Sequence, residues 1–238
     1  MPKGFLFANS IHAPMTTEND LTARERVSSD VQSEVASPHG RFYVFEGIDG
    51  AGKSTVAGKV FEILKAGTDR EIVLTSEPSD SWLGDCVRRS HREGVSPISE
   101  ALLFVADRAH HTERIRKWLE DGMIVLSDRY YASTLAYQGA ALKPLLGGMA
   151  VPWLKSINEP AIIRPDMTFL LLIPPETGMK RLSERNERTK FEKLGFLREV
   201  DKIYRDLAEE DETFVVIDAS RSIEEVTGTI VEAMKGNI

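Results

Sequence analysis

Residues 47–54, Gly-Ile-Asp-Gly-Ala-Gly-Lys-Ser, conform to the pattern G-x-x-x-x-G-K-[ST]. The aromatic and β-branched run Phe42-Tyr43-Val44-Phe45 precedes them and predicts a buried strand. Residues 54–66 follow, and their apolar side chains lie on one face of a predicted helix, which ends at Gly67. A glycine-rich turn between a strand and a helix surrounds a phosphate with backbone N–H groups and with the positive end of the helix dipole. The sequence therefore predicts a loop that binds a nucleoside triphosphate.

Each polar residue of this loop has an expected task. Lys53 would lie against the β- and γ-phosphates, and Ser54 would ligate Mg²⁺. The carboxylate of Asp49 would face the phosphates, a place that suits it only if a metal ion or a substrate hydroxyl lies between them. We expect the ATP site to comprise Gly47, Ile48, Asp49, Gly50, Ala51, Gly52, Lys53, Ser54 and Thr55.

The rest of the chain alternates strand and helix patterns. Four more short apolar runs predict strands, at residues 71–75, 123–126, 168–173 and 213–217. Helical patterns fill the gaps, at residues 97–120, 134–138, 151–158, 176–187 and 195–209 and from 222 onward. Strands separated by helices pair in parallel and are covered on both faces. The expected fold is α/β, a three-layer P-loop NTPase fold with a central five-stranded parallel sheet flanked by helices.

Composition narrows the classes of protein to consider. The 238 residues carry a formal net charge of −7 and include 42% hydrophobic residues and one cysteine, Cys86. An acidic chain is a poor partner for nucleic acid or for an anionic membrane, and one cysteine excludes a disulfide framework. Residues 1–40 are polar and lack periodicity, so we expect a disordered N-terminal extension before a single domain at 41–238. We expect a soluble, cytoplasmic protein.

Further polar groups are expected at the same edge of the sheet, because they follow strands or lie on the long helix. Glu77-Pro78 follows the second strand, and Asp128-Arg129-Tyr130 follows the third. Phe104 and Arg108 are four residues apart and so share a helical face. An aromatic ring beside a guanidinium group makes a platform for a planar base.

Taken in order, these motifs resemble those of the thymidylate kinase family. The chain contains E-G-x-x-G-x-G-K-[ST], E-P, F-x-A-D-R, D-R-Y-x-x-S-x-x-A-Y-Q, R-P-D and I-D-A between Arg41 and the C-terminus. As an ordered set they are specific, although no single one is. The resemblance implies phosphorylation of dTMP to dTDP with ATP and Mg²⁺, in dTTP biosynthesis, by a protein that is usually a homodimer.

The resemblance also implies roles for individual residues. Phe104 would stack on thymine, Arg108 would bond to the base with Ser133 or Thr134 nearby, and Arg129 would hold the acceptor phosphate. Asp49 would face the sugar 3′-hydroxyl or the metal ion, and Asp128 would orient Mg²⁺ or its waters. The remaining expected substrate contacts are Glu77, Pro78, Tyr137 (under the deoxyribose), Gln138 and Tyr204 (closing over the nucleotide). A surface ion pair with Glu113 or Asp107 remains the alternative for Arg108, and a place in the core the alternative for Tyr204.

Two other functions fit the phosphate loop. One is a kinase for another nucleoside monophosphate or for a deoxynucleoside. The other is a P-loop ATPase or nucleotide-binding module, which would need no acceptor site. A GTPase is disfavoured because no [NT]-K-x-D motif follows a later strand.

Some members of the family have an arginine in the phosphate loop, and others use basic residues of a mobile lid. The phosphate loop of this chain has no arginine, so the resemblance implies that the catalytic positive charge comes from the basic run 181–190, with Arg185 and Arg188 favoured over Arg181 and Lys190. The chain departs from the family pattern at one place. Ser76 stands before Glu77-Pro78, where bacterial relatives often have arginine. The phosphate or loop contact that this arginine makes is therefore either absent here or supplied by Arg88, Arg89 or Arg92.

Replacing Arg185 or Arg188, the two favoured arginines of the basic run, should slow the chemical step. We expect Arg185→Ala or Arg188→Ala to lower kcat by at least about tenfold with smaller effects on KM, because the cation is needed in the transition state more than in the ground state. Steady-state kinetics of both single variants and the double variant check this. An unchanged kcat in all three would contradict it.

Overall fold

The structure, a computed structural model, describes residues 40–181 and 187–236. The chain divides into two units, residues 1–36 and 37–238, and all the elements described below belong to the second. The expected extension, residues 1–40, lies outside the described residues except for Gly40.

The core is one parallel sheet of five strands. The strands are β1 (Arg41–Glu46), β2 (Ile72–Ser76), β3 (Ile124–Asp128), β4 (Met167–Leu172) and β5 (Phe214–Asp218), and they lie in the order β2-β3-β1-β4-β5. Their uninterrupted apolar runs fit a sheet that is covered on both faces. The expected fold class and all five expected strands are confirmed, with ends that differ by one or two residues.

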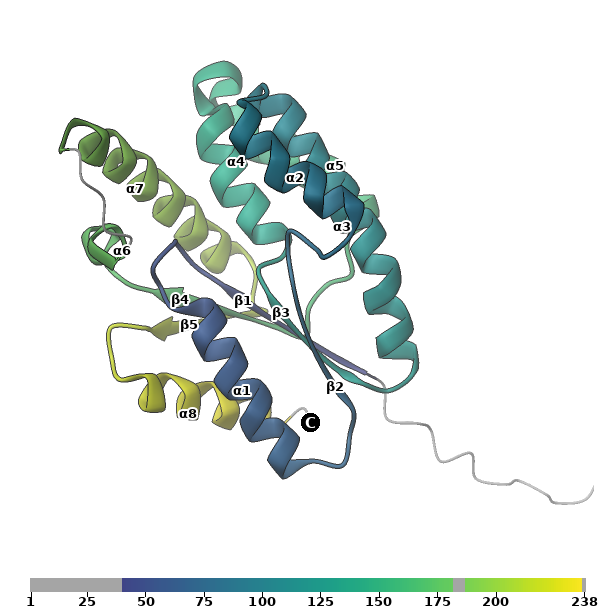
Figure 1. Cartoon of the computed structure of the whole chain (residues 1–238). Helices are drawn as coiled ribbons and strands as arrows, with labels where there is room; N and C mark the ends of the chain where they lie inside the picture. The colour runs from purple at the N-terminus through teal and green to yellow at the C-terminus, as the bar shows by residue number, and fades with distance from the viewer. Residues whose placement is uncertain (1–39, 182–186, 237–238) are drawn as a thin grey trace, which may run out of the picture. The chain divides into compact units, whose positions relative to one another are not determined.

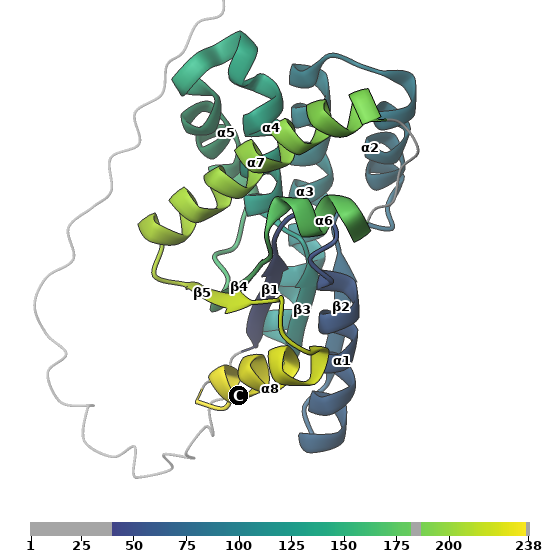
Figure 2. The same ribbon diagram turned by 90° about the vertical axis from the view of Figure 1, so that its left-hand side faces the viewer.

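Helices form a layer on each side of this sheet (Figures 1 and 2). On one side α1 (Lys53–Gly67) packs beside α8 (Ile223–Met234). On the other lie α3 (Pro97–Glu120), α4 (Tyr131–Leu146), α5 (Ala150–Asn158) and α7 (Glu187–Glu210), with α2 (Trp82–Glu93) packed against α3. The short α6 (Pro175–Arg181) follows β4.

The structure corrects three helical expectations. It contains α2, for which the sequence analysis predicted no helix, and α4 extends well beyond the expected residues 134–138. Pro144 lies in the last turn of α4, where it removes one helical hydrogen bond, that of its own missing N–H. The helix α7 begins at Glu187 rather than at 195. Of the expected helix 176–187, the structure describes α6 as far as Arg181, and residues 182–186 lie outside the described residues.

The order of the strands brings three loops to one edge. β1 pairs with β3 on one side and β4 on the other, so the chain changes direction across the sheet beside β1. Phe45 and Ser76 are both in register with Asp128, which places the ends of β1, β2 and β3 next to one another. In open parallel sheets, ligands bind at this edge beside such a switch point.

The start of α2 packs closely on the loop that follows β2. Ser81 caps the helix by accepting hydrogen bonds from Leu83 N (3.1 Å) and Gly84 N (3.2 Å). A Cβ atom at Gly84 would lie 2.0 Å from the carbonyl oxygen of Ser79. Only glycine fits there, because the backbone of the loop fills the space.

Two alanine substitutions should therefore have opposite effects. Gly84→Ala should lower the free energy of unfolding by about 1–3 kcal/mol, because the methyl group overlaps backbone. Gly58→Ala, at a helical position with nothing within 4 Å, should raise it by about 0.5–1 kcal/mol. Urea denaturation of both variants measures the difference, and equal effects would contradict the packing described here.

Candidate active site

The expected phosphate loop lies between β1 and α1 around an open cavity. Gly47, Gly50 and Gly52 have positive φ angles of 137°, 83° and 91°. The cavity has a volume of about 270 Å³ and is lined by Asp49, Gly50, Gly52, Lys53, Ser54, Thr55, Asp128 and Arg129. The side chains of Ile48 and Ala51 are buried in the core, so these residues present only backbone to a ligand.

Lys53 is almost wholly buried at the floor of this cavity. Its ammonium group donates to the carbonyl oxygen of Ile48 at 2.9 Å. Burial, and next the positive charge of Arg129, lower the pKa of Lys53 to about 8. A polyphosphate at this place would favour the charged form, because opposite charge restores the proton.

Ser54 and Asp128 suit a magnesium ion held together with phosphates. The hydroxyl of Ser54 donates to Oδ2 of Asp128. Oδ1 of Asp128 is buried and has no hydrogen-bond partner in the described part of the chain. Among those same residues, no group of three His, Cys, Asp or Glu side chains is placed to hold a metal ion. The oxygen atoms of Ser54 and Asp128 fit Mg²⁺ as ligands, because this ion usually binds to one or two protein groups and to substrate phosphates.

A second cavity adjoins the phosphate loop on the α8 side. Its volume is about 260 Å³, and its lining is Ala51, Gly52, Thr55, Val56, Arg181, Ala219, Arg221, Ile223 and Val226. Arg181, at the end of α6, donates to the carbonyl oxygen of Gly50 at 2.8 Å. The two cavities share Gly52 and Thr55, so one extended ligand can occupy both.

A third cavity lies on the other side of the phosphate loop. Its volume is about 180 Å³, and it is lined by Asp49, Pro78, His91, Phe104, Arg129, Ser133, Tyr137 and Gln138. All but His91 are residues that the sequence analysis expected to contact the acceptor, and we therefore call this the acceptor cavity. Asp49 and Arg129 line both the acceptor cavity and the cavity around the phosphate loop, which we call the phosphate cavity. The three cavities therefore form a row, with the phosphate loop in the middle.

Arg129 stands at the boundary between the two cavities it lines. Its guanidinium forms an ion pair with the carboxylate of Asp49, donates to Ser133 Oγ at 3.0 Å and lies 5.2 Å from the centre of the Tyr137 ring. Its φ angle is 73°, in the left-handed region that a side chain disfavours. Such a conformation persists only where the surroundings impose it.

Arg108 lies away from the acceptor cavity. It is 1% exposed, and it donates to Glu77 Oε2 at 2.6 Å, to Asn158 Oδ1 at 2.5 Å and to Thr134 Oγ1 at 2.9 Å. The structure thus does not show the surface ion pair with Glu113 or Asp107, because the partner is Glu77. Arg108, Thr134 and Glu77 form a buried network behind the cavity.

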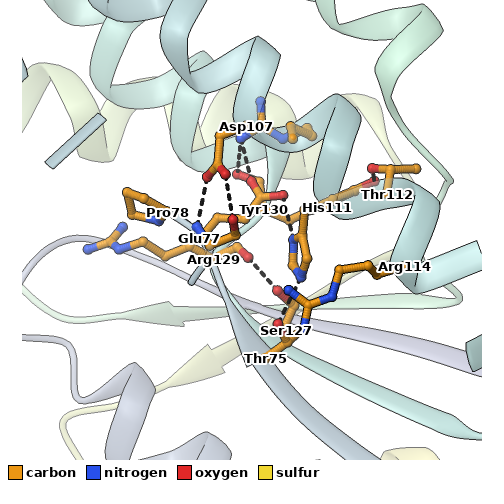
Figure 3. A network of polar contacts seen from close by, with 12 residues as sticks. Thr75, Glu77, Pro78, Asp107, His111, Thr112, Arg114, Ser127, Arg129 and Tyr130 are labelled. Atoms are coloured by element: carbon orange, nitrogen blue, oxygen red, sulfur yellow. Dashed lines mark hydrogen bonds and ion pairs between the residues drawn. The ribbon is translucent and has the colours of Figure 1, made fainter. Parts of the chain in front are cut away.

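This network holds the loop that follows β2 (Figure 3). The carboxylate of Glu77 also contacts Nδ1 of His111 at 3.1 Å, and Nε2 of that ring contacts Thr75 Oγ1 at 2.8 Å. Two residues on, Ser79 donates its backbone N–H to Asp107 at 2.7 Å. Glu77 therefore fixes the loop, and its neighbour Pro78 lines the cavity.

Tyr204 is covered by protein rather than placed over a nucleotide. It is wholly buried, and its hydroxyl donates to Glu46 Oε2 at 2.8 Å. Its ring lies edge-on to Tyr137, with centroids 6.4 Å apart. In this structure the core alternative for Tyr204 is the one observed.

The sequence analysis did not single out His91 or Glu46. His91 lines the acceptor cavity from α2, and its ring lies 5.8 Å from that of Phe104. It was missed together with its helix, although Ser81 and Gly94 mark the ends of that helix. Glu46 belongs to the E-G motif, but nothing local in the sequence shows what its side chain contacts.

The structure describes only part of the basic run 181–190. Arg185 and the side chain of Arg188 lie outside the described residues. Beside Ser76, the loop 77–81 gains a contact from Arg88, which donates to the carbonyl oxygens of Pro78 (3.2 Å) and Ser79 (2.8 Å). Arg89 instead pairs with Glu93.

One further cavity, of about 340 Å³, lies among α4, α5, α7 and the start of β5. The cations on its rim, Lys155 and Arg164, pair with Glu210 and Glu159. It is separate from the row of three.

Among the described helices, none is both long enough and apolar enough to cross a membrane.

Comparison with known proteins gives one family. A family model described as thymidylate kinase matches residues 45–230. A probable thymidylate kinase of Methanoculleus marisnigri is 44% identical over 183 residues, covering 76% of this chain and 87% of the relative. One of Methanosarcina acetivorans is 42% identical over 196 residues (81% and 94%), and one of Thermococcus onnurineus is 41% identical over 202 residues (80% and 95%). The chain therefore belongs to the thymidylate kinase family.

Proposed function

We propose that the row of cavities transfers the γ-phosphoryl group of ATP to the 5′-phosphate of dTMP. An oxygen of the dTMP phosphate forms the new bond to the γ-phosphorus, and the bond to the β,γ-bridging oxygen breaks, which gives dTDP and ADP. The observation that carries this assignment is the boundary that the two neighbouring cavities share, Asp49 and Arg129. Phosphorylation of dTMP is the activity of the family to which the chain belongs, and to it we add the role of each residue.

On the donor side, the phosphate loop binds the ATP polyphosphate with its backbone N–H groups and with Lys53. The cavity that Arg181 and Arg221 line would take the nucleoside part of ATP. Arg181 already reaches the carbonyl oxygen of Gly50, so it is close enough to supply positive charge that the loop itself lacks. Cationic groups of this kind stabilise the charge that spreads over the oxygens of the transferred group.

Ser54 and Asp128 would hold Mg²⁺, which when bound neutralises charge on the β- and γ-phosphates. The unpartnered Oδ1 of Asp128 supports this assignment. Asp128 ends β3 and so stands beside the phosphate loop at the end of β1.

On the acceptor side, Arg129 would bind the dTMP phosphate and direct it toward the phosphate loop. Its planar guanidinium can hold one phosphate with two parallel hydrogen bonds. Asp49 lies opposite, where its carboxylate can face the sugar 3′-hydroxyl. Since acceptor and donor are then held in line, positioning contributes a large part of the rate.

Phe104, Tyr137 and Gln138 would recognise the nucleoside. The ring of Phe104 offers a flat apolar surface to the base. Gln138 lines the same cavity, and its Oε1 is buried without a partner in the described residues. This oxygen is suited to accept the imide N–H of thymine, which cytosine lacks. The ring of Tyr137 would lie under the deoxyribose and leave little room for a 2′-hydroxyl.

Two further points belong to the same proposal. The chain would form a homodimer through the α2–α3 side, where Trp82 and Leu102 are 69% and 48% exposed. Large exposed apolar side chains of this kind favour protein contacts. A cytoplasmic location suits the free thiol of Cys86.

A panel of acceptors tests the proposed substrate. With ATP and Mg²⁺ in a coupled assay, kcat/KM should be highest for dTMP, and thymidine should give no turnover because it lacks the phosphate that Arg129 binds. Arg129→Ala should lower kcat/KM for dTMP by about a hundredfold or more, in line with the loss of a buried charged partner. Turnover of another nucleotide in place of dTMP, or ATP hydrolysis that needs no acceptor, would overturn the proposal.

The affinity for ATP should fall as the pH rises through about 8. Burial lowers the pKa of Lys53 to about 8, and bound phosphates would favour its charged form. Deprotonation of Lys53 should therefore weaken the binding of ATP. From pH 8 to 9.5 the dissociation constant of ATP should rise by up to about tenfold per pH unit. Calorimetric titration measures it.

Lys53→Arg is the matched control, because a guanidinium stays charged over this range. Its dissociation constant should not change between pH 7 and 9.5. A flat profile for the unmodified chain would mean that Lys53 does not control ATP binding.

A further inference from the structure

Glu46 is a carboxylate that is entirely buried at the end of β1, immediately before the phosphate loop. Its Oε1 accepts hydrogen bonds from the backbone N–H groups of Tyr130 (2.9 Å) and Ser133 (3.0 Å). Its Oε2 accepts from Ser133 Oγ (2.6 Å) and Tyr204 OH (2.8 Å). An unsatisfied carboxylate in the core is very costly. Here each oxygen accepts two hydrogen bonds, so the surroundings of Glu46 are arranged for a carboxylate with a structural role.

The structural role of Glu46 is at the start of α4. The helix has no cap from a side chain of its own at Tyr130, and its first N–H groups need acceptors. Glu46, at the end of β1, supplies the acceptor, and its negative charge interacts favourably with the positive end of the helix dipole. Glu46 therefore anchors the segment that contains Arg129 and Ser133 to the strand that carries the phosphate loop.

The hydroxyl of Ser133 extends this anchor to the guanidinium group of Arg129. It donates to Glu46 and accepts from Nη1 of Arg129 at 3.0 Å. The backbone of Arg129, with its φ of 73°, is held on both sides: its N–H donates to Phe45 O at 3.0 Å, and its carbonyl oxygen accepts from Ser127 Oγ at 2.7 Å. Arg129 is thus fixed at the backbone by β1 and β3, and at the side chain through Ser133.

We propose that Glu46, itself supported by Tyr204, is a positioning residue for the acceptor phosphate: it orients Ser133, and Ser133 orients the guanidinium of Arg129. The proposal rests on the role assigned above to Arg129. Glu46 does not line either cavity that Arg129 lines, so it acts through Arg129 and not on the substrate.

Two substitutions separate this role from a contribution to stability alone. Glu46→Gln keeps the shape of the side chain but turns one acceptor oxygen into a donor, which faces the donors described above. Tyr204→Phe removes only a hydroxyl, which donates to Oε2 of Glu46 and lies 2.9 Å from Ser133 Oγ. We expect the dissociation constant for dTMP to rise by about tenfold in Glu46→Gln and by a smaller factor in Tyr204→Phe, and that for ATP to change by less than about twofold in both.

Asp201→Asn is the matched control. Asp201 is another buried acid, 8% exposed, on the same helix as Tyr204, and its contact is with Arg205. Losing its charge should leave the affinities for dTMP and ATP unchanged. Thermal unfolding of each variant, and saturation-transfer NMR with dTMP and with ATP on the full chain, give the required measurements.

The decisive comparison repeats Glu46→Gln in an Arg129→Gln background. If Glu46 acts through Arg129, the second substitution should change the dissociation constant for dTMP by less than about twofold, because the group it orients is gone. If the two effects instead multiply, or if dTMP and ATP affinities fall together, Glu46 supports the fold in general and the proposal is overturned.

Failure of this proposal is distinct from failure of the proposed function. If the unmodified chain phosphorylates dTMP while folded Glu46→Gln and Tyr204→Phe both bind dTMP as tightly as it does, the positioning role is wrong and the function stands. If the unmodified chain neither binds nor phosphorylates dTMP, the function is wrong. Should Glu46→Gln fail to fold, Tyr204→Phe alone decides, because it leaves the carboxylate in place.

Discussion

The ion pair between Arg129 and Asp49 is the contact on which the rest of the site depends. It joins the loop after β3 to the loop after β1, and its two members are the residues that line both the phosphate cavity and the acceptor cavity. Each charge of the pair compensates the other. A phosphate bound beside Arg129, as we propose, would take over part of that compensation. The proposed site would then need little reorganisation when the anion binds.

The sheet makes this contact possible, since it places the ends of β1 and β3 side by side in register. Neither loop would keep its shape unaided. Arg129 has a left-handed backbone, Glu46 is buried with its charge facing α4, and Glu77 is buried between Arg108 and His111. Glu46 and Glu77 are 0% and 5% exposed, and a buried carboxylate is costly for stability. Glu46 binds to Ser133, which lines the acceptor cavity, and Glu77 precedes Pro78, which lines it too. These two buried acids therefore help to position residues of the site.

The fold was largely predictable, because its signals are local. Each strand is a short apolar run, and the glycines and Lys53 fix the strand–turn–helix at the phosphate loop. The helix α2 was missed because it is strongly polar and buries little apolar surface, although its capping residues were visible. At the site, all the residues that line the acceptor cavity except His91 are among those that the sequence analysis expected to contact the acceptor. The tasks of Arg108 and Tyr204 were not predictable from spacing, because their partners, Glu77 and Glu46, are 31 and 158 residues away in the sequence.

The central claim is that one continuous row of cavities holds donor and acceptor at the same time, with Arg129 and Asp49 between them. Calorimetric titration with a single molecule, in which adenosine and thymidine are joined 5′ to 5′ through a chain of phosphates, tests it most directly. The account predicts one bound molecule per chain, displaced both by ATP and by dTMP, and binding much tighter than that of either nucleotide alone because the two halves are linked. Displacement by only one of the two nucleotides, or two molecules bound per chain, would contradict it.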